Sequence, residues 1–339
     1  MTIAMKRDIL IMVLLLFLVV LFSVSVNENI LLEGVVIQDL DTVWSIAFLP
    51  NGNMLFTERP GRLHFFDGTD HIIAEINVSE VSESGLMGLA VDPEYESNHF
   101  IYLYYTHEEN ENRIARFTLE NNRLLNEVIL IDNILAARFH DGGRLAFGPD
   151  GKLYATTGDA TIPSTAQDLT SLSGKILRMN KDGSIPEDNP FQSYVWSYGH
   201  RNPQGIVWNN DVMYASEHGP SANDEINIIE KGNNYGWPSE CSDDEKYTQP
   251  IRCFTEFTLA PGGIAVNDNI LYVAGLRSTQ LRKLTLDGRK ILKEEVIIDN
   301  IGRIRDVVRH DGYLYIGTSN NDGRGLPHPH DDKIIRVTE

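Results

Sequence analysis

One pattern of apolar and polar residues recurs along the chain: a short apolar strand, a polar turn, and a second apolar strand that is often rich in tyrosine. Asn-Gly and Asp-Gly turns separate several of these strand pairs, and they favour tight hairpins because glycine reaches positive φ without steric cost. Most copies continue into a third strand that ends in another polar turn. The first strands of the six copies are expected at Ser45–Phe48, Gly88–Val91, Leu145–Phe147, Gly205–Trp208, Gly263–Val266 and Asp306–Arg309.

Six matched copies predict an all-β protein, namely a six-bladed β-propeller of four-stranded blades over residues 35–339. The copies begin about 43 to 60 residues apart, and no convincing amphipathic helix interrupts them. A large β-sandwich would account for the strands but not for their repetition. In a propeller the loops between blades at one end surround a central channel, so these loops are where a ligand site is expected.

The N-terminus carries a separate signal. Lys6 and Arg7 precede an apolar run from Ile9 to Phe22, and small residues follow at Ser23–Ser25. This order is typical of a secretory signal peptide over residues 1–26. The apolar stretch is also about long enough to remain as a membrane anchor. Either interpretation predicts an extracytoplasmic protein, secreted or anchored to the outer face of the cytoplasmic membrane.

Charge and cysteine content narrow the possible functions. The formal net charge is −19 and the pI is about 4.9, which argues against a nucleic-acid partner because phosphate binding depends on Lys and Arg. No glycine-rich βαβ fingerprint supports a nicotinamide cofactor. Cys241 and Cys253 could close a short disulfide loop in an exported protein or remain as two thiols. Their spacing suits neither a zinc ribbon nor a CxxC redox motif.

Four polar, glycine-rich segments are candidates for the ligand site: Arg138–Arg144, Ser197–Gly205, Glu217–Glu225 and Arg303–Asp306. The first contains His140 on a loop that enters a rigid hairpin, and a titratable group on a scaffold-held loop is a common way to build a site. A lone histidine is nevertheless more often structural, so the neighbouring loops have to decide its role.

Arginines stand out in this acidic chain. Arg201, Arg277, Arg303 and Arg305 fall at equivalent blade edges, and arginine pairs bidentately with planar carboxylates or phosphates. Their convergence would indicate a polyanionic small ligand, whereas the alternative is ion pairing at the surface. Asp224, Glu225 and nearby carbonyls offer hard oxygen ligands, which suit Ca²⁺ better than zinc. An exposed acidic turn is the alternative for these two residues.

The motifs HDGGRLAFGPDGKLYATTGD, YGHRNPQG, EHGPSANDEIN with NYGWP, and RIRD occur in this order between Leu40 and Thr338. The chain thereby resembles the soluble PQQ-dependent aldose (glucose/sorbosone) dehydrogenase family. The resemblance implies a six-bladed propeller that oxidises aldose sugars at the anomeric carbon to lactones. It also implies pyrroloquinoline quinone (PQQ) and Ca²⁺ as cofactors, and an electron acceptor that the sequence does not identify.

The resemblance also implies residue roles. His140 matches the general base that takes the proton of the anomeric hydroxyl, and Asp141 beside it is a candidate to orient the ring. Glu83 stands where a glutamine often contacts the cofactor, and a carboxylate there would need protonation or a cation. The remaining matches are Arg201 and Asn202 for the quinone, Arg277, Arg303 and Arg305 for its carboxylates, the carbonyls of Gly219 and Pro220 for the catalytic Ca²⁺, and Glu225 with the Tyr235 carbonyl for a second Ca²⁺.

Two other functions are compatible with a propeller. A Ca²⁺-dependent sugar lactonase would need carboxylate and asparagine metal ligands facing the channel, and the expected ring of arginines fits an anionic cofactor better. A non-catalytic recognition module would be expected to lack the histidine or several arginines, all of which are present here.

Overall fold

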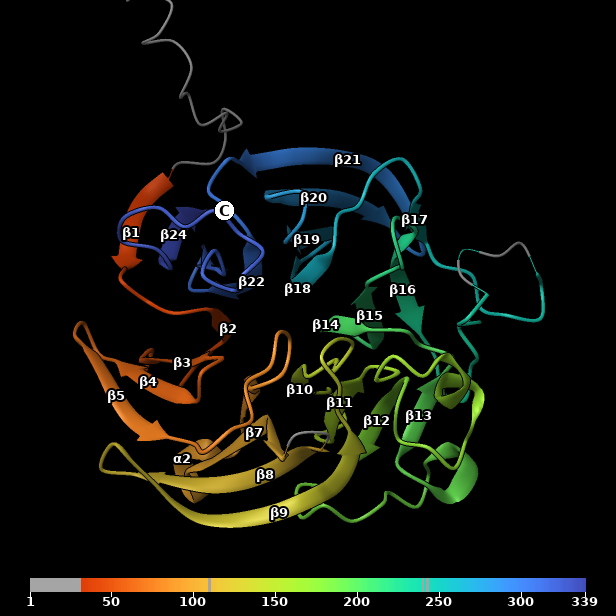
Figure 1. Ribbon diagram of the computed structural model, residues 1–339, viewed down its shortest axis with the longest axis horizontal. Coiled ribbons are helices and arrows are strands. Elements are labelled where there is room, and N and C mark those ends of the chain that lie inside the picture. Colours follow the sequence, from red (N-terminus) through yellow and green to blue (C-terminus); the bar gives the residue numbers. More distant parts are fainter. Residues whose placement is uncertain (1–31, 109–110, 240, 242–243) are drawn as a thin grey trace, which may run out of the picture.

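The computed structural model describes residues 32–108, 111–239, 241 and 244–339. The described residues form six four-stranded antiparallel sheets arranged around a central axis (Figure 1). This confirms the predicted six-bladed β-propeller. The predicted signal or anchor segment, residues 1–26, lies outside the described residues. Among those described, no helix has the length and apolar character needed to cross a membrane.

Blades 1 to 3 each use four consecutive strands. Blade 1 comprises β2 (Val43–Phe48), β3 (Met54–Glu58), β4 (Arg62–Phe66) and β5 (Asp70–Glu75). Blade 2 comprises β6 (Leu86–Val91), β7 (Phe100–Glu108), β8 (Glu111–Glu120) and β9 (Arg123–Leu135). Blade 3 comprises β10 (Leu145–Phe147), β11 (Leu153–Thr157), β12 (Lys175–Met179) and β13 (Val195–Tyr198).

The other half of the ring repeats this order. Blade 4 comprises β14 (Pro203–Asn209), β15 (Val212–Glu217), β16 (Asp224–Ile229) and β17 (Arg252–Phe254). Blade 5 comprises β18 (Pro261–Asn267), β19 (Ile270–Gly275), β20 (Gln280–Asp287) and β21 (Lys290–Asp299). Blade 6 comprises β22 (Ile304–His310), β23 (Tyr313–Thr318), β24 (Ile334–Thr338) and β1 (Leu32–Ile37). Short helical turns are α2 (Tyr95–Asn98), η1 (Pro163–Gln167) and η2 (Pro190–Gln192).

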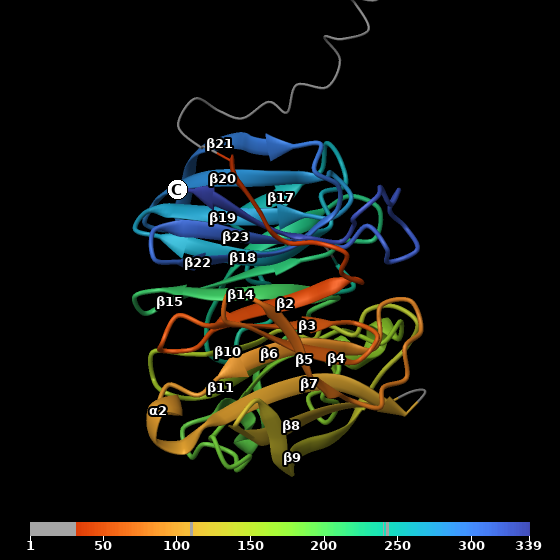
Figure 2. The same cartoon turned by 90° about the vertical axis from the view of Figure 1, so that its left-hand side faces the viewer.

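The ring is closed by strand β1, which is the outermost strand of blade 6. It pairs antiparallel with β24, with Leu32 opposite Val337 and Val35 opposite Ile335. The two ends of the described chain therefore share one sheet, in which β1 and β24 lie side by side (Figure 1), and Figure 2 gives the side view of the ring. Closure in this way leaves only short blade edges unpaired, which stabilises a propeller and protects it from edge-to-edge association.

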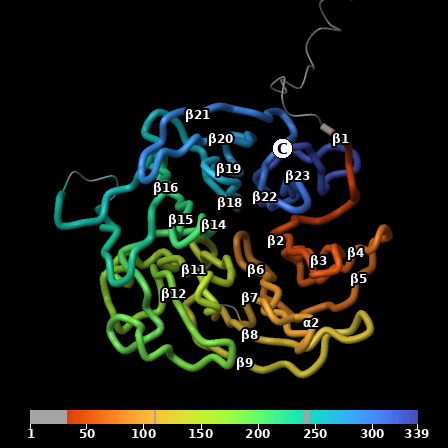
Figure 3. Tube along the Cα trace, turned by 180° about the vertical axis from the view of Figure 1, so that it is seen from behind, coloured from red at the N-terminus to blue at the C-terminus, as the bar shows by residue number. Residues whose placement is uncertain are grey.

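Each blade packs its faces against its neighbours. The first strands of the blades, such as β2, β14 and β18, lie nearest the axis, as the view from behind shows (Figure 3). One cluster of buried side chains joins Trp44 of blade 1, Tyr104 of blade 2 and Leu153 of blade 3. Burying a large apolar side chain contributes about 1.5–3 kcal/mol, so these contacts between blades hold the ring rigid.

Arg144 links four blades near the axis. Its Nη1 donates to Asp306 Oδ2 at 3.1 Å and to Ser45 Oγ at 3.0 Å, and its Nε donates to the Gln204 carbonyl at 2.9 Å. The guanidinium also lies over the ring of Trp44. A buried cation with this many partners fixes the relative positions of the loops above it.

Cys241 and Cys253 form a disulfide with a Cα–Cα distance of 6.1 Å. The structure thus selects one of the two alternatives that the sequence left open. The bond fixes the segment that follows Trp237 to strand β17, beside Glu225, whose Oε1 accepts a hydrogen bond from the Cys241 amide at 3.1 Å.

Candidate functional site

A cavity of about 560 Å³ lies where the loops between blades converge. All four polar, glycine-rich segments that the sequence marked as candidates for the ligand site contribute residues to its lining. Nine of the predicted site residues border it: Glu83, His140, Arg201, Asn202, Gly219, Pro220, Arg277, Arg303 and Arg305. The other two, Glu225 and Tyr235, border a much smaller hollow next to it. Closing the ring therefore brings together side chains that are more than 200 residues apart in sequence.

His140 is held with one ring nitrogen fixed. Its Nδ1 lies 2.7 Å from Asp159 Oδ1, and Asp159 is fully buried. The same carboxylate accepts hydrogen bonds from the Thr161 amide at 2.8 Å and from Trp237 Nε1 at 2.7 Å. Because an ionised carboxylate only accepts hydrogen bonds, Nδ1 carries the proton. Nε2 is then the nitrogen that can accept a proton from a group in the cavity.

Asp141 does not orient His140, contrary to the expectation from the sequence. Its side chain is buried, and Oδ1 accepts hydrogen bonds from Asn112 Nδ2 at 3.1 Å and the Ala137 amide at 3.0 Å. Burial, reinforced by the charge of Glu83, raises the pKa of Asp141 to about 7. The expectation failed because consecutive residues on this turn point in different directions, and the partner of His140 comes from beyond the hairpin.

The His140 loop requires close backbone contacts. His140 adopts φ 68°, a left-handed conformation that is uncommon for a residue with a side chain. A Cβ atom on Gly158 would lie 1.8 Å from the His140 carbonyl oxygen, so only glycine fits at that position. The Asn202 side chain also accepts a hydrogen bond from the Gly142 amide at 3.0 Å. The strained loop is thus fixed from two sides, as expected for a functional loop.

Glu83 places a carboxylate in the same cavity. Burial alone would raise its pKa, but the charges of His218, Arg324 and Arg305 and the hydrogen bond from the His140 amide lower it to about 2. Burial also lowers the pKa of His218 to about 3, so His218 is neutral at neutral pH. The arginines and the amide therefore keep Glu83 ionised under those conditions.

The predicted arginines reach the cavity in different environments. Arg303 pairs with Asp322 at 2.8 Å, whereas the Arg305 side chain is buried against the Gln204 side-chain oxygen, which accepts its hydrogen bond. Burial lowers the pKa of Arg305 to about 9, and its Nε has no hydrogen-bond partner within the described part of the chain. Arg277 is exposed, and its guanidinium forms no ion pair with any described residue. Arg324, which the sequence did not indicate, adds a fifth guanidinium.

The candidate metal ligands lie on the loop after β15. The Gly219 carbonyl accepts a hydrogen bond from Arg201 Nη1 at 2.9 Å, and the Gly219 amide donates to Asp224 Oδ1 at 2.9 Å. Asp224 Oδ2 in turn accepts from the Leu259 and Ala260 amides at 2.7 and 2.9 Å. Asp224 therefore shapes the loop through backbone amides, and the Gly219 carbonyl already faces a cation.

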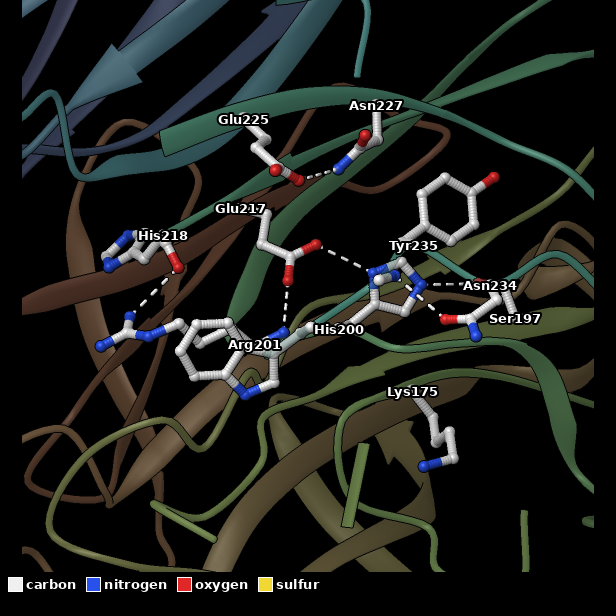
Figure 4. Close-up of polar contacts among 12 residues, drawn as sticks. Lys175, Ser197, His200, Arg201, Glu217, His218, Glu225, Asn227, Asn234 and Tyr235 are labelled. Carbon is white, nitrogen blue, oxygen red and sulfur yellow. Dashed lines mark hydrogen bonds and ion pairs between the residues drawn. The ribbon is translucent and has the colours of Figure 1, made fainter. Parts of the chain in front are cut away.

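The smaller hollow, of about 10 Å³, is the size of a single water molecule or ion. Glu217, Glu225 and Tyr235 border it and supply oxygen atoms. Figure 4 shows how Glu217 is held: one carboxylate oxygen accepts from the Arg201 amide and the other from His200 Nδ1, at 2.8 Å for the latter. The sequence did not single out Glu217.

Several residues of the site were missed because their signal is weak in sequence. Asp159 and Glu217 both stand inside the motifs given above. Asp159 lies two residues after strand β11, and Glu217 is the last residue of β15. Many other acidic residues in this chain also lie at strand ends, so this position alone did not single them out. Arg324 belongs to no motif. Only the folded ring shows that these side chains face the cavity or support residues that do.

Comparison with known proteins agrees with the fold. The family model described as glucose / sorbosone dehydrogenase matches residues 40–328. The chain is 31% identical over 338 residues to the aldose sugar dehydrogenase YliI of Escherichia coli K12, covering 86% of this chain and 91% of that protein. It is 32% identical over 270 residues to the quinoprotein glucose dehydrogenase B of Acinetobacter calcoaceticus, covering 67% of this chain and 56% of that protein.

Among solved structures, the PQQ-bound form of the aldose sugar dehydrogenase from Streptomyces coelicolor superposes with a TM-score of 0.88 at 34% identity. The match covers 93% of this chain and 99% of that one. The described residues thus form a β-propeller with an arginine-rich cavity. The chain belongs to the glucose/sorbosone dehydrogenase family and is a sugar dehydrogenase, an oxidoreductase. The family resemblance found in the sequence is confirmed.

Proposed function

We propose that this protein oxidises aldose sugars at the anomeric carbon to lactones, with PQQ and Ca²⁺ as cofactors and His140 as the general base. The observation that carries the proposal is the His140–Asp159 pair at 2.7 Å, which fixes one ring nitrogen while the residue borders a cavity with five arginines. A base with a fixed tautomer and a strongly cationic cavity are the two parts that this oxidation needs.

The cavity fits a small polyanion. PQQ carries three carboxylates, and Arg277, Arg303 and Arg305 are available to contact them because all three border the cavity. Arg305 Nε has no hydrogen-bond partner among the described residues, and a buried donor of this kind is costly unless a ligand satisfies it. The names of relatives point the same way, since the Streptomyces structure holds PQQ and the Acinetobacter enzyme is a quinoprotein.

Calcium fits the oxygen atoms around the loop after β15. Gly219 and Pro220, whose carbonyls are the expected ligands, border the cofactor cavity, and Glu225 and Tyr235 border the single-ion hollow. Carbonyl and carboxylate oxygens are the ligands that Ca²⁺ prefers. Arg201 contacts the Gly219 carbonyl at 2.9 Å, so this carbonyl is already oriented toward positive charge.

The reaction divides between the cofactor and the chain. When bound, PQQ would accept the hydride that leaves the anomeric carbon. His140 Nε2 takes the proton of the anomeric hydroxyl, so the C–O bond gains double-bond character and the lactone forms. Asp159 stabilises the imidazolium that results, because its carboxylate faces Nδ1–H. The arginines favour the negative charge that develops on the reduced ligand.

We also infer that the protein works outside the cytoplasm, because the sequence predicts a signal peptide or anchor at residues 1–26. Electrons would then pass to an acceptor in that compartment. Fractionation of cells that express the full chain tests the location, and recovery in the cytoplasm would contradict it.

The experiment that tests the proposed function is a titration of the purified protein with PQQ in the presence and absence of Ca²⁺, followed by a panel of aldoses with an artificial electron acceptor. Saturable PQQ binding and sugar-dependent reduction of the acceptor are expected. Hydrolysis of a lactone without added quinone would instead indicate a lactonase. No PQQ binding at all would indicate a propeller that serves only in recognition.

A further inference from the structure

A carboxylate lies inside the cavity that is otherwise suited to an anion. Glu83 Oε2 accepts hydrogen bonds from the His140 amide at 3.0 Å and from Asn202 Nδ2 at 3.3 Å. Its other oxygen, Oε1, pairs with Arg324 Nη1 at 2.9 Å. Glu83 is thus the shared acceptor for the backbone of the predicted base, for a predicted ligand-binding side chain, and for the one cavity arginine that the sequence did not indicate.

Arg324 reaches Glu83 from the opposite end of the chain, 241 residues away. It lies on the loop between β23 and β24, where its amide donates to Asp322 Oδ1 at 2.9 Å and its guanidinium stacks over Phe139 at 4.9 Å. Asp322 also pairs with Arg303 at 2.8 Å. One short loop therefore positions two arginines, and Arg324 is held between Phe139, the neighbour of His140, and Glu83.

We propose that Arg324 is the counter-cation of Glu83, and that this pair allows an ionised carboxylate to hold the His140 loop without repelling the anionic cofactor. Arg324 is then a positioning residue that acts on cofactor affinity through Glu83. The inference rests on the proposed function, because it takes the ligand of the cavity to be PQQ.

The physical reason is a conflict between two tasks at one position. An acceptor is needed at residue 83, because the His140 amide and the Asn202 side chain both donate to it. A glutamine could accept through its carbonyl oxygen without a charge, whereas glutamate brings a negative charge into a cavity for an anion. Like charges within one cavity destabilise the bound ligand unless a cation neutralises one of them. Arg324 supplies that cation at 2.9 Å.

This arrangement predicts a characteristic pattern of coupling. In Arg324→Ala the charge of Glu83 is no longer neutralised, so PQQ binding should weaken by about tenfold, or about 1.4 kcal/mol. The factor is modest because the Arg324 side chain is 44% exposed and solvent screens the pair. In the double variant Glu83→Gln/Arg324→Ala the acceptor oxygen remains and the charge is gone, so the affinity should return to within about threefold of the wild type.

The test is an equilibrium titration of apo protein with PQQ at saturating Ca²⁺ for the wild type, the two single variants and the double variant. Arg277→Ala, with and without Glu83→Gln, is the matched control, because Arg277 borders the same cavity without contacting Glu83 in the described structure. Glu83→Gln should improve binding much more in the Arg324→Ala background than in the Arg277→Ala background. Thermal unfolding of the apo variants should change little, which separates an effect on binding from one on folding.

Two results would overturn the inference while leaving the proposed function intact: unchanged PQQ affinity in Arg324→Ala, or the same gain from Glu83→Gln in both arginine backgrounds. Absence of PQQ binding by the wild-type protein would overturn the proposed function itself, and this inference with it. The wild-type titration therefore tells the two failures apart.

Discussion

Two of the histidine–carboxylate pairs in the propeller have similar geometry but lie in different surroundings. His140 Nδ1 lies 2.7 Å from Asp159, and His200 Nδ1 lies 2.8 Å from Glu217. The second nitrogen of His200 is also occupied, since Nε2 lies 2.8 Å from Ser197 Oγ, and the ring is fully buried and stacked on Tyr235 (Figure 4). His140 instead keeps 17% of its side chain exposed and borders the cavity.

The difference shows which of the two histidines is placed to act as the proposed base. Serine, histidine and glutamate at 2.8 Å spacing resemble a nucleophilic triad, yet Ser197 is buried and borders neither the cavity nor the single-ion hollow. A pair with both nitrogens occupied can only hold its neighbours in place. The pair with one nitrogen facing a cavity can exchange a proton with a substrate.

Replacing His140 is the strongest way to test this contrast. His140→Ala removes the base, and general-base catalysis contributes about 10²–10⁴-fold to rate. We expect sugar turnover by PQQ-loaded protein to fall by about 10³-fold, or about 4 kcal/mol. The unfolding free energy should change by less than about 1 kcal/mol because the ring is partly exposed and lies on a loop. Near wild-type turnover in this variant would exclude His140 as the base.

Replacing His200 should have the opposite profile. His200→Ala removes two buried hydrogen bonds and leaves Glu217 buried with one donor fewer, and breaking a buried pair in this way costs about 3 kcal/mol or more. We expect a large loss of unfolding free energy in denaturant titrations. Ser197→Ala is the matched control, with a loss of about 1 kcal/mol for one hydrogen bond. A stable His200→Ala protein with no turnover would reverse the roles assigned to the two histidines.

Asp159→Asn tests whether the carboxylate orients His140. The asparagine oxygen would be needed on the side of His140 Nδ1 and the Thr161 amide, so its NH₂ group would face Trp237 Nε1–H, a donor facing a donor. We expect kcat to fall by about 10²-fold, or about 2.7 kcal/mol. The double variant with His140→Ala should be no worse than His140→Ala alone, because the carboxylate acts through the histidine. An additive loss would mean a separate role for Asp159.

The sequence predicted the fold well because the apolar pattern is clear in the buried strands of each blade. Strands such as β3 and β11 are buried at every position, and each is joined to the strand before it by a short turn, so the local sequence pattern locates them. The outer strands were not located in this way. Strand β5 is largely exposed, and β1 pairs with β24 across almost the whole chain, which no local pattern can indicate.

The candidate site was predictable where its residues stand in long motifs, as His140, Arg201 and Arg305 do. The partners of these residues were not predictable, because they depend on side-chain direction in the folded ring. Asp141 was predicted as the partner because it is next to His140 in sequence. The carboxylate that contacts the His140 imidazole is instead Asp159, which follows the end of strand β11. Arg324 was missed for the same reason, since its relation to Glu83 exists only after blade 6 closes against blade 1.

Replacing Asp141, which does not orient the predicted base as expected, should have a smaller main effect in free energy than replacing His140, His200 or Asp159, and this effect should depend on pH. Its pKa is raised by burial from 3.8 to about 7. Between these values the unfolded chain has released the proton and the folded protein has not, so folding is favoured at low pH and this stability is lost as pH rises toward 7. Asp141→Asn removes the titration. At pH 8 the absence of the buried charge should raise the unfolding free energy of the variant by about 4 kcal/mol. The unpaired buried NH₂ group of the asparagine should lower it by about 2 kcal/mol.

The expected outcome for Asp141→Asn is therefore a stabilisation of about 2 kcal/mol at pH 8 and a slight destabilisation at pH 4, measured by denaturant titration at both values. Asn112→Ala is a useful control because it removes a donor to Asp141 and should not reverse sign with pH. A pH-independent effect of Asp141→Asn would mean that Asp141 stays ionised in the folded protein. A free carboxylate would then lie beside His140 in sequence, and the roles of Asp141 and Asp159 would have to be compared again.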